Sequence, residues 1–343
     1  MGWKGSRVSA GATKNAIPAW LSLLLAALSL CLGCTPRQPP VDMYLDAVML
    51  GELGQNELAV RKLNGVIAAD PDFALAYSEL GKAHQKLGDD EKALSAFRKA
   101  AKLDPWSFES HMNLAAACMK LGNYPEAAGA YARAVELAPK NLDALIGAAE
   151  SHLKAGQYMK SLVYCEQAEQ TGERTGEVLR LLAWVYEGQK DYEQAIRVYR
   201  RLLSSNGEDV DVLLALAVAH MKTGQYDKAR GVLIPVTQMR PEDGTAFRHL
   251  GYCLIKLGEI DQAVQMYRKS IESNNDDWEA HRGLGVAYMI KARRTADARL
   301  RAEAIKHWRR SLSIAPGQPK HEVLEQLIKE QSKLENPLQG LNY

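Results

Sequence analysis

The sequence predicts an all-α solenoid, a stack of about eight helix-turn-helix units without a single central core. Three sets of residues recur on a 34-residue period, and a unit of that length has room for two helices of ordinary length and two short turns. Because three independent sets share one period, the repeat is a property of the fold. The sets are Pro71, Pro105, Pro139 and Pro241; Gly54, Gly88, Gly122, Gly156, Gly224 and Gly258; and Ala59, Ala93, Ala127, Ala195, Ala229 and Ala263.

Each recurrent residue type has a physical role in such a unit. Small residues such as Gly81 and Ala93 permit two antiparallel helices to approach closely, and Leu80 and Phe97 fill the space beside that contact. Gly88 and its equivalents favour the turn between the helices, and the prolines end the second helix. One unit cannot bury its apolar faces alone, so we expect the units to stack continuously.

The first 33 residues are expected to be an export signal. The first half of this segment carries Lys4, Arg7 and Lys14 and no acidic residue, and the mainly apolar run 17–32 follows. That run is shorter than the roughly 20 residues of a transmembrane helix. A basic stretch before a short apolar core is typical of a signal peptide.

The end of this segment, Leu32-Gly33-Cys34, resembles a bacterial lipobox. The resemblance implies cleavage before Cys34 and lipid attachment to its thiol and new amino group. An ordinary signal peptide or an uncleaved anchor is the alternative. Residues 34–39 are proline-rich and are expected to form a short tether. Inner-membrane lipoproteins typically carry Asp at the position of Thr35, so the resemblance favours the outer membrane, facing the periplasm.

The repeat grid divides residues 40–318 into eight units. The eighth is seven residues longer than the others, which is close to two helical turns, so we expect each of its helices to gain one turn. Residues 319–335 are expected to form a capping helix with one apolar face, and residues 336–343 a tail. The units are 40–73, 74–107, 108–141, 142–175, 176–209, 210–243, 244–277 and 278–318.

Further residues at fixed offsets identify the kind of repeat. They are Leu80-Gly81, Leu250-Gly251 and Leu284-Gly285, and the aromatic residues Phe97, Tyr131, Tyr199, Tyr267 and Trp308. The pattern resembles the tetratricopeptide repeat. This resemblance implies a right-handed superhelical solenoid in which the first helix of each unit lines a concave groove, where ligand peptides usually lie.

Composition and motifs exclude several classes of function. With 47% hydrophobic and 24% charged residues the chain is not disordered, and a net charge of +2 is too small for a dedicated nucleic-acid binder. The sequence has no His-Glu-x-x-His, no paired Cys-x-x-Cys and no Walker-type loop. His84, His152 and His220 lie two units apart, too far to share a metal ion. We expect no enzyme, cofactor, metal, small-molecule substrate or nucleic-acid partner.

The resemblance places an unusually apolar set of residues in the groove, together with two pairs of an arginine and an aromatic residue. Arg180 with Trp184, and Arg248 with Tyr252, are each four residues apart and are of the types that dominate interface energetics. Our hypothesis is a groove for an extended or helical protein segment whose acidic groups meet the arginines. The alternative is that Trp184 packs on a neighbouring unit and the arginines stay solvated. The candidate residues are Arg180, Trp184, Leu214, Val218, Met221, Arg248, Tyr252, Ile255, Arg282 and Met289.

Two sets of basic residues are open to two interpretations. The first set either forms a basic patch for an anionic polymer, lipid head groups or an acidic partner, or is a solvated helix face. It comprises Arg293, Arg294, Arg299, Arg301, Arg309 and Arg310. The second set either forms an anion track or offsets helix dipoles, and we favour the dipoles. It comprises Lys86, Lys120, Lys154, Lys222 and Lys256.

These expectations combine into a membrane-tethered adaptor that holds a client protein during assembly of an envelope machine such as a pilus or secretion system. Outer-membrane lipoproteins that help pilus secretins assemble are similar in layout. One alternative is a targeting or regulatory module of an exopolysaccharide or glycosyl-transfer enzyme complex. Another is a soluble cytoplasmic scaffold.

Overall fold

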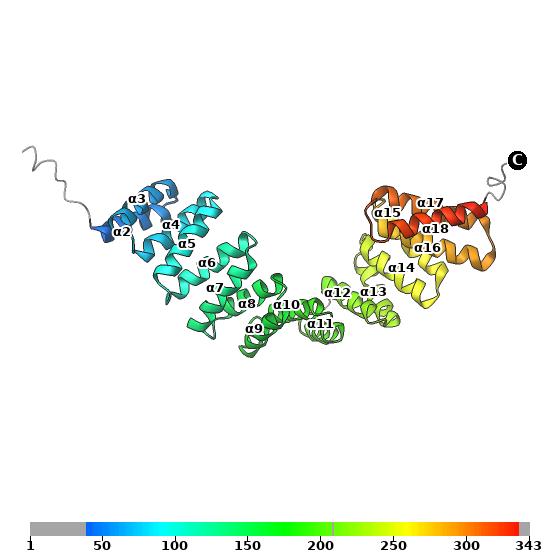
Figure 1. Cartoon of the computed structure of the whole chain (residues 1–343). Coiled ribbons are helices and arrows are strands. Elements are labelled where there is room, and N and C mark those ends of the chain that lie inside the picture. The colour runs from blue at the N-terminus through cyan, green and yellow to red at the C-terminus, as the bar shows by residue number, and fades with distance from the viewer. Residues whose placement is uncertain (1–38, 208, 336–343) are drawn as a thin grey trace, which may run out of the picture. The chain divides into compact units, whose positions relative to one another are not determined.

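The structure is a computed structural model, and it describes residues 39–207 and 209–335. Within these residues it contains seventeen α-helices and no strand, which confirms the predicted all-α class (Figure 1). The predicted signal segment, Cys34 and the tail 336–343 lie outside the described residues. The chain divides into two compact units between Asp104 and Pro105, although the 34-residue grid continues through that point.

The first compact unit consists of four helices, each packed on the next. They are α2 (Pro40–Glu52), α3 (Asn56–Ala69), α4 (Ala74–Leu87) and α5 (Asp90–Leu103). Its core includes Leu63 and Val66, which are fully buried. A Cβ at Gly81 would lie 2.5 Å from the ring of Phe97, so the close approach of α4 and α5 requires a glycine.

The second compact unit consists of thirteen helices, again with each packed on the next. Contacts of α6 with α8, α8 with α10, α12 with α14 and α14 with α16 also bring first helices of neighbouring repeats together. The helices are α6 (Phe108–Lys120), α7 (Tyr124–Leu137), α8 (Leu142–Lys154), α9 (Tyr158–Gln170), α10 (Thr175–Gly188), α11 (Tyr192–Asn206), α12 (Val210–Lys222), α13 (Tyr226–Met239), α14 (Gly244–Leu257), α15 (Ile260–Ser273), α16 (Trp278–Thr295), α17 (Ala298–Ile314) and α18 (His321–Glu335).

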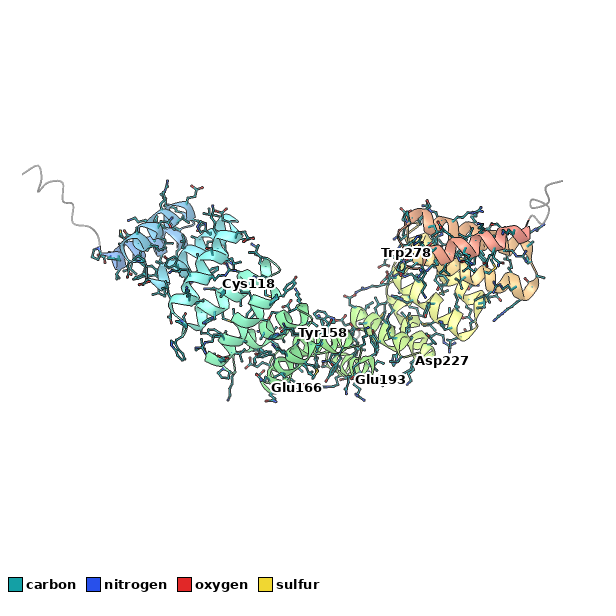
Figure 2. All side chains as sticks on the ribbon, in the orientation of Figure 1. Cys118, Tyr158, Glu166, Glu193, Asp227 and Trp278 are labelled. Atoms are coloured by element: carbon teal, nitrogen blue, oxygen red, sulfur yellow. The ribbon has the colours of Figure 1, made fainter. Side chains whose placement is uncertain are left out.

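The helix starts coincide with the repeat grid of the sequence. Seven first helices begin at the residue where the grid begins a unit, and α10 begins one residue earlier, at Thr175. Helix α16, whose first residue Trp278 is labelled in Figure 2, has 18 residues against 14 in α14. Helix α17 has 17 residues against 14 in α15. Each helix of the last repeat is therefore longer by about one turn.

The turn between the two helices of a repeat requires a left-handed residue. Glycine supplies it in most repeats, with φ between 71° at Gly156 and 81° at Gly258. The fifth and eighth repeats lack this glycine, and Lys190 (φ 61°) and Ala296 (φ 53°) adopt the same conformation. A residue with a Cβ pays about 1 kcal/mol there, so these two turns are strained relative to the others.

The alanine position of the repeat holds a small side chain even in the repeat where it is not alanine. Ser161 occupies the one gap in the alanine series; it is fully buried, and its hydroxyl donates to the carbonyl of Ala149 at 2.6 Å. Cys118, Cys165 and Cys253 are buried, and Cys118 is labelled in Figure 2. Burial raises the pKa of Cys165 and of Cys253 to about 12, so both stay protonated at neutral pH.

Helix α18 packs on α17 and buries Leu324 and Ile328, while Val323 stays 55% exposed. Between residues 39 and 335, apart from position 208, none of the helices has the length and apolar character needed to span a bilayer.

Candidate functional site

A groove of about 710 Å³ lies along α12, α14 and α16 and is bounded at its far end by α18. We call it the C-terminal groove. Since α12, α14 and α16 are the first helices of their repeats, it lies on the side that the sequence predicts for ligands. Its lining residues are Val218, Met221, Lys222, Arg248, His249, Tyr252, Ile255, Lys256, Tyr267, Glu279, Arg282, Gly283, Val286, Trp308, Pro319, Lys320, Val323, Leu324 and Leu327.

Six of the ten candidate groove residues line this groove: Val218, Met221, Arg248, Tyr252, Ile255 and Arg282.

The other four candidates lie elsewhere. Arg180 and Trp184 are on α10, outside the groove, and Leu214 packs against the core of the last repeats. The expectation for Met289 is wrong: it is only 4% exposed and belongs to that core.

Tyr252 is the aromatic centre of the groove. It is 39% exposed, and its ring meets that of Tyr226 edge-to-face with 6.0 Å between centroids. The ammonium of Lys256 lies 5.5 Å from the Tyr252 centroid, within the range of a cation–π interaction. Burial and the neighbouring Tyr226 raise the pKa of Tyr252, so its hydroxyl remains a hydrogen-bond donor.

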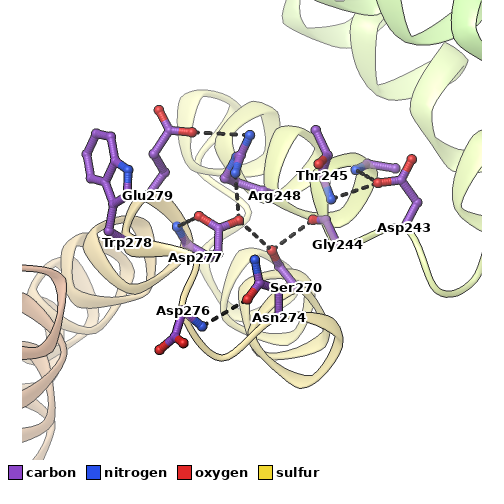
Figure 3. Close-up of polar contacts among 12 residues, drawn as sticks. Asp243, Gly244, Thr245, Arg248, Ser270, Asn274, Asp276, Asp277, Trp278 and Glu279 are labelled. Atoms are coloured by element: carbon purple, nitrogen blue, oxygen red, sulfur yellow. Dashed lines mark hydrogen bonds and ion pairs between the residues drawn. The ribbon is translucent and has the colours of Figure 1, made fainter. Parts of the chain in front are cut away.

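Arg248 is held by carboxylates of its own chain (Figure 3). It donates to Asp277 Oδ2 at 2.6 Å, and a second guanidinium nitrogen lies 3.1 Å from Glu279. Asp277 is the N-cap of α16, where its other oxygen accepts from the Ala280 amide at 3.0 Å. The Asp277 side chain is only 7% exposed. The Arg248 charge is therefore balanced before any ligand arrives, contrary to the role in ligand binding that the sequence indicated for it.

Arg180 forms the equivalent contact two repeats earlier. It donates to Asp209 Oδ2 at 3.1 Å, and Asp209 is the N-cap of α12. In both pairs the aspartate lies 29 residues after the arginine, so the arginine joins one repeat to the next. Arg282 instead donates to the carbonyl of Pro319 at 3.3 Å.

The lysines supply the free positive charge of the groove. Lys222, Lys256 and Lys320 are exposed, and within the described residues no carboxylate lies within 4.0 Å of their ammonium groups. The 34-residue lysine series contains this signal, because Lys222 and Lys256 belong to it, but the helix-dipole interpretation that the sequence favours leaves no role in ligand binding for them. Lys320 and the α18 residues could not be placed from the sequence because they meet the groove only after the chain folds back.

The groove as a whole is basic above an apolar floor. Five basic side chains line it, against the single acidic Glu279. His249 adds no charge at neutral pH because burial, together with Arg248, lowers its pKa to about 4. This arrangement suits a ligand that carries carboxylates beside apolar side chains.

The buried histidines have ordinary structural roles. His152 and His220 are 6% and 2% exposed, and each ring places Nδ1 near a glutamine side-chain oxygen, at 2.8 Å for Gln157 and 3.1 Å for Gln225. In the part of the chain that the structure describes, no group of three or more His, Cys, Asp or Glu side chains is positioned to hold a metal ion.

The predicted basic patch divides in two. Arg310 pairs with Asp276 at 2.8 Å, and Arg309 lies 3.5 Å from the Ser332 hydroxyl. The remaining four arginines form no ion pair or side-chain hydrogen bond with described residues. These are Arg293, Arg294, Arg299 and Arg301.

Comparison with curated proteins finds short similar segments. The chain is 28% identical over 98 residues to the BBSome complex member BBS4 of Bos taurus. It is also 28% identical over 98 residues to the small glutamine-rich tetratricopeptide repeat-containing protein 2 of Mycosarcoma maydis. Each match covers 29% of this chain but only 19% and 28% of those proteins.

Comparison with solved structures also finds similar chains. A tetratricopeptide repeat protein from Parabacteroides merdae aligns with a TM-score of 0.48 at 15% identity, over 73% of this chain and 99% of that one. MamA from Desulfovibrio magneticus RS-1 aligns with a TM-score of 0.47 at 18% identity, over 52% and 96% of the two chains.

Family models described as tetratricopeptide repeats match most of the chain. The matched residues are 49–88, 79–142, 119–185, 187–251 and 250–310. These matches indicate no enzymatic family, and tetratricopeptide repeats are generally protein-binding scaffolds. With its 34-residue period and its paired helices, the chain belongs to the tetratricopeptide repeat family.

Proposed function

We propose that this protein is a non-enzymatic adaptor that holds an acidic segment of a client protein in the C-terminal groove. The observation that carries the proposal is the free charge of that groove: Lys222, Lys256 and Lys320 line it without a carboxylate partner among the described residues, above an apolar floor. A client segment with Asp or Glu beside apolar residues would satisfy both parts of the surface.

The groove has the layout of a protein-binding site. Tyr252 lies at its centre, Met221, Ile255 and Val286 provide apolar contact, and the lysines lie at the ends of α12 and α14. Aromatic anchors surrounded by polar residues dominate the energetics of protein interfaces, and methionine adapts to varied partners. An amphipathic helix or an extended strand of the client would place its apolar side chains against this floor.

The proposal includes a membrane tether and a place in the cell envelope, as an assembly factor of a machine such as a pilus or secretion system. The support for the tether is the Leu32-Gly33-Cys34 sequence. Incorporation of labelled fatty acid into the protein, lost in Cys34→Ser, tests it. Retention of the label in that variant contradicts lipidation at Cys34.

Site-specific photo-crosslinking tests the groove. A photoreactive residue at Tyr252 should capture the client in cells, whereas the same residue at Ile234, 43% exposed on α13, should not. Mass spectrometry of the adduct should identify a segment with acidic and apolar residues. Replacing Lys222 and Lys256 with Glu should abolish the Tyr252 adduct. Equal capture from both positions, or capture that survives the charge reversal, contradicts the proposal.

A further inference from the structure

The turn of the last repeat carries arginines whose side chains have no partner among residues 39–207 and 209–335. We call the segment from Lys291 to Glu303, which includes the end of α16, the turn and the start of α17, the arginine tip. Other arginines of the second compact unit are engaged: Arg240 pairs with Asp211 at 2.7 Å. The side chains of four tip arginines pair with no described residue. They are Arg293, Arg294, Arg299 and Arg301.

The tip extends beyond the turns of the neighbouring repeats. Helix α16 begins on the repeat grid at Trp278, and α17 ends at Ile314, in register with the end of α15 once the seven added residues are counted. All of the added length therefore lies at the turn. One extra helical turn adds about 5 Å to each helix. The arginine tip thus protrudes past the turn at Gly258 of the preceding repeat.

The carboxylates near the tip interact with groups other than the tip arginines. Asp297 caps α17 and accepts from the Arg299 and Leu300 amides at 2.8 and 3.4 Å. Glu303 lies 3.5 Å from the ammonium of Lys306.

A third carboxylate, Asp261 of α15, accepts from Lys291 at 2.5 Å. None of the three forms an ion pair with a tip arginine, and Arg293, Arg294 and Arg299 are exposed while Arg301 is partly buried.

The other side chains of the tip restrict what it can bind. Between Met289 and His307 the sequence contains no aromatic residue, so the tip has no surface on which bases could stack. No large hydrophobic residue of this segment is exposed, so an apolar anchor for a protein partner is also missing. The residues between the arginines in the sequence are Thr295, Ala296, Asp297, Ala298 and Leu300. What remains is a small protruding surface of guanidinium groups, which suits a plane of phosphates.

We propose that the arginine tip binds the surface of a membrane that contains anionic phospholipids. This contact is independent of the C-terminal groove. Each basic residue near such a surface increases membrane partition about fivefold, so removal of four should reduce it on the order of a hundredfold after screening by salt.

Vesicle binding by the full-length protein tests the proposal. Binding is measured to vesicles of phosphatidylcholine alone and of phosphatidylcholine mixed with phosphatidylglycerol. The N-terminal segment, which carries Lys4, Arg7 and Lys14, is the same in every variant, so the change between variants in the ratio of the two binding constants reports the tip. The test variant is Arg293→Gln/Arg294→Gln/Arg299→Gln/Arg301→Gln.

A matched control removes the same charge elsewhere on the second compact unit. It is Lys140→Gln/Lys160→Gln/Lys228→Gln/Lys269→Gln, four exposed lysines. The preference for anionic vesicles should disappear in the arginine variant, persist in the control, and weaken at high salt. A variant with lysine at the four arginine positions should keep most of the binding, because the attraction is to charge.

Four results would overturn the proposal. They are an unchanged preference in the arginine variant with its thermal unfolding also unchanged, an equal loss in the control, a complete loss with the lysine substitutions, and a wild-type protein that binds RNA or an acidic protein but shows no preference for anionic vesicles.

Discussion

The repeat formed by α10 and α11 and the repeat formed by α14 and α15 begin from nearly the same pattern. Each has an arginine followed four residues later by an aromatic residue, and each arginine donates to the N-cap aspartate of the next first helix. Yet Trp184 is 48% exposed outside the C-terminal groove, whereas Tyr252 is the centre of it.

The neighbours of each repeat cause the difference. Helix α14 is followed by α16, which adds Glu279 to the Arg248 pair, and then by α18, which bounds the groove. Arg180 has a single carboxylate partner, and its Nε is buried without a hydrogen-bond partner among the described residues. The same local pattern therefore lines a groove only where the helices that follow it supply the remaining lining residues.

The largest expected effect comes from removing the two arginines. Arg248→Met leaves the Asp277 carboxylate, 7% exposed, without its partner and should destabilise α14 to α16 by about 2–3 kcal/mol. Arg180→Met breaks a pair whose side chains are 43% and 29% exposed, and should cost under about 1 kcal/mol. Local opening free energies from hydrogen exchange measure both. Equal losses of stability in the two variants would show that the contribution of these ion pairs does not depend on their burial.

The aromatic residues should differ in client binding. Tyr252→Ala should weaken the affinity for the crosslinked client by roughly tenfold or more, as expected for an anchor at the centre of an interface. Trp184→Ala should leave it unchanged, because Trp184 does not line the C-terminal groove. Titration of the purified client into each folded variant provides the measurement. A loss on Trp184→Ala would extend the binding surface to α10.

Acid should lower the stability of the α14 repeat and leave the stability of the α10 repeat unchanged. His249 on α14 has its pKa lowered to about 4, mainly by burial and then by Arg248, with Asp243 and Asp277 acting in the opposite direction. The equivalent position on α10 is Leu181.

Because the unfolded chain binds the proton first, stability is complete above about pH 6.5 and is lost as the pH falls towards 4. We expect a loss on the order of 1 kcal/mol in α14 between pH 7 and pH 5. Hydrogen exchange corrected for the intrinsic rate at each pH should show it in the wild type and not in His249→Leu. A pH dependence that persists in that variant would assign it to another group, such as His307 on α17, whose pKa burial and His281 also lower to about 4.

The smallest expected effect concerns the turns. Lys190→Gly should stabilise the α10 repeat by about 0.5 kcal/mol, since glycine relieves the left-handed strain but loses more entropy on folding. The reciprocal change Gly258→Lys should destabilise the α14 repeat by about 1 kcal/mol. Thermal unfolding of the two variants provides the comparison. A loss of stability in Lys190→Gly would mean that the Lys190 side chain contributes more than its backbone costs.

Much of the fold was predictable because its signals are local. The positions of Gly88 and its equivalents marked the turns, and the late arrival of Trp308 predicted the longer helices of the last repeat. The site was only partly predictable. Position within a repeat indicated Val218, Tyr252 and Ile255, which line the C-terminal groove, but also suggested Met289, which is buried.

The sequence alone determined the class of fold and the approximate length of the helices, because these depend on spacing within 34 residues. Only the tertiary structure decided which charges are available. Arg248 meets Asp277 29 residues later, and Lys320 reaches the groove only because the chain folds back into α18. Whether a charged side chain binds its own protein or remains free for a partner depends on the elements that pack against it, and its position in a repeat does not contain that information.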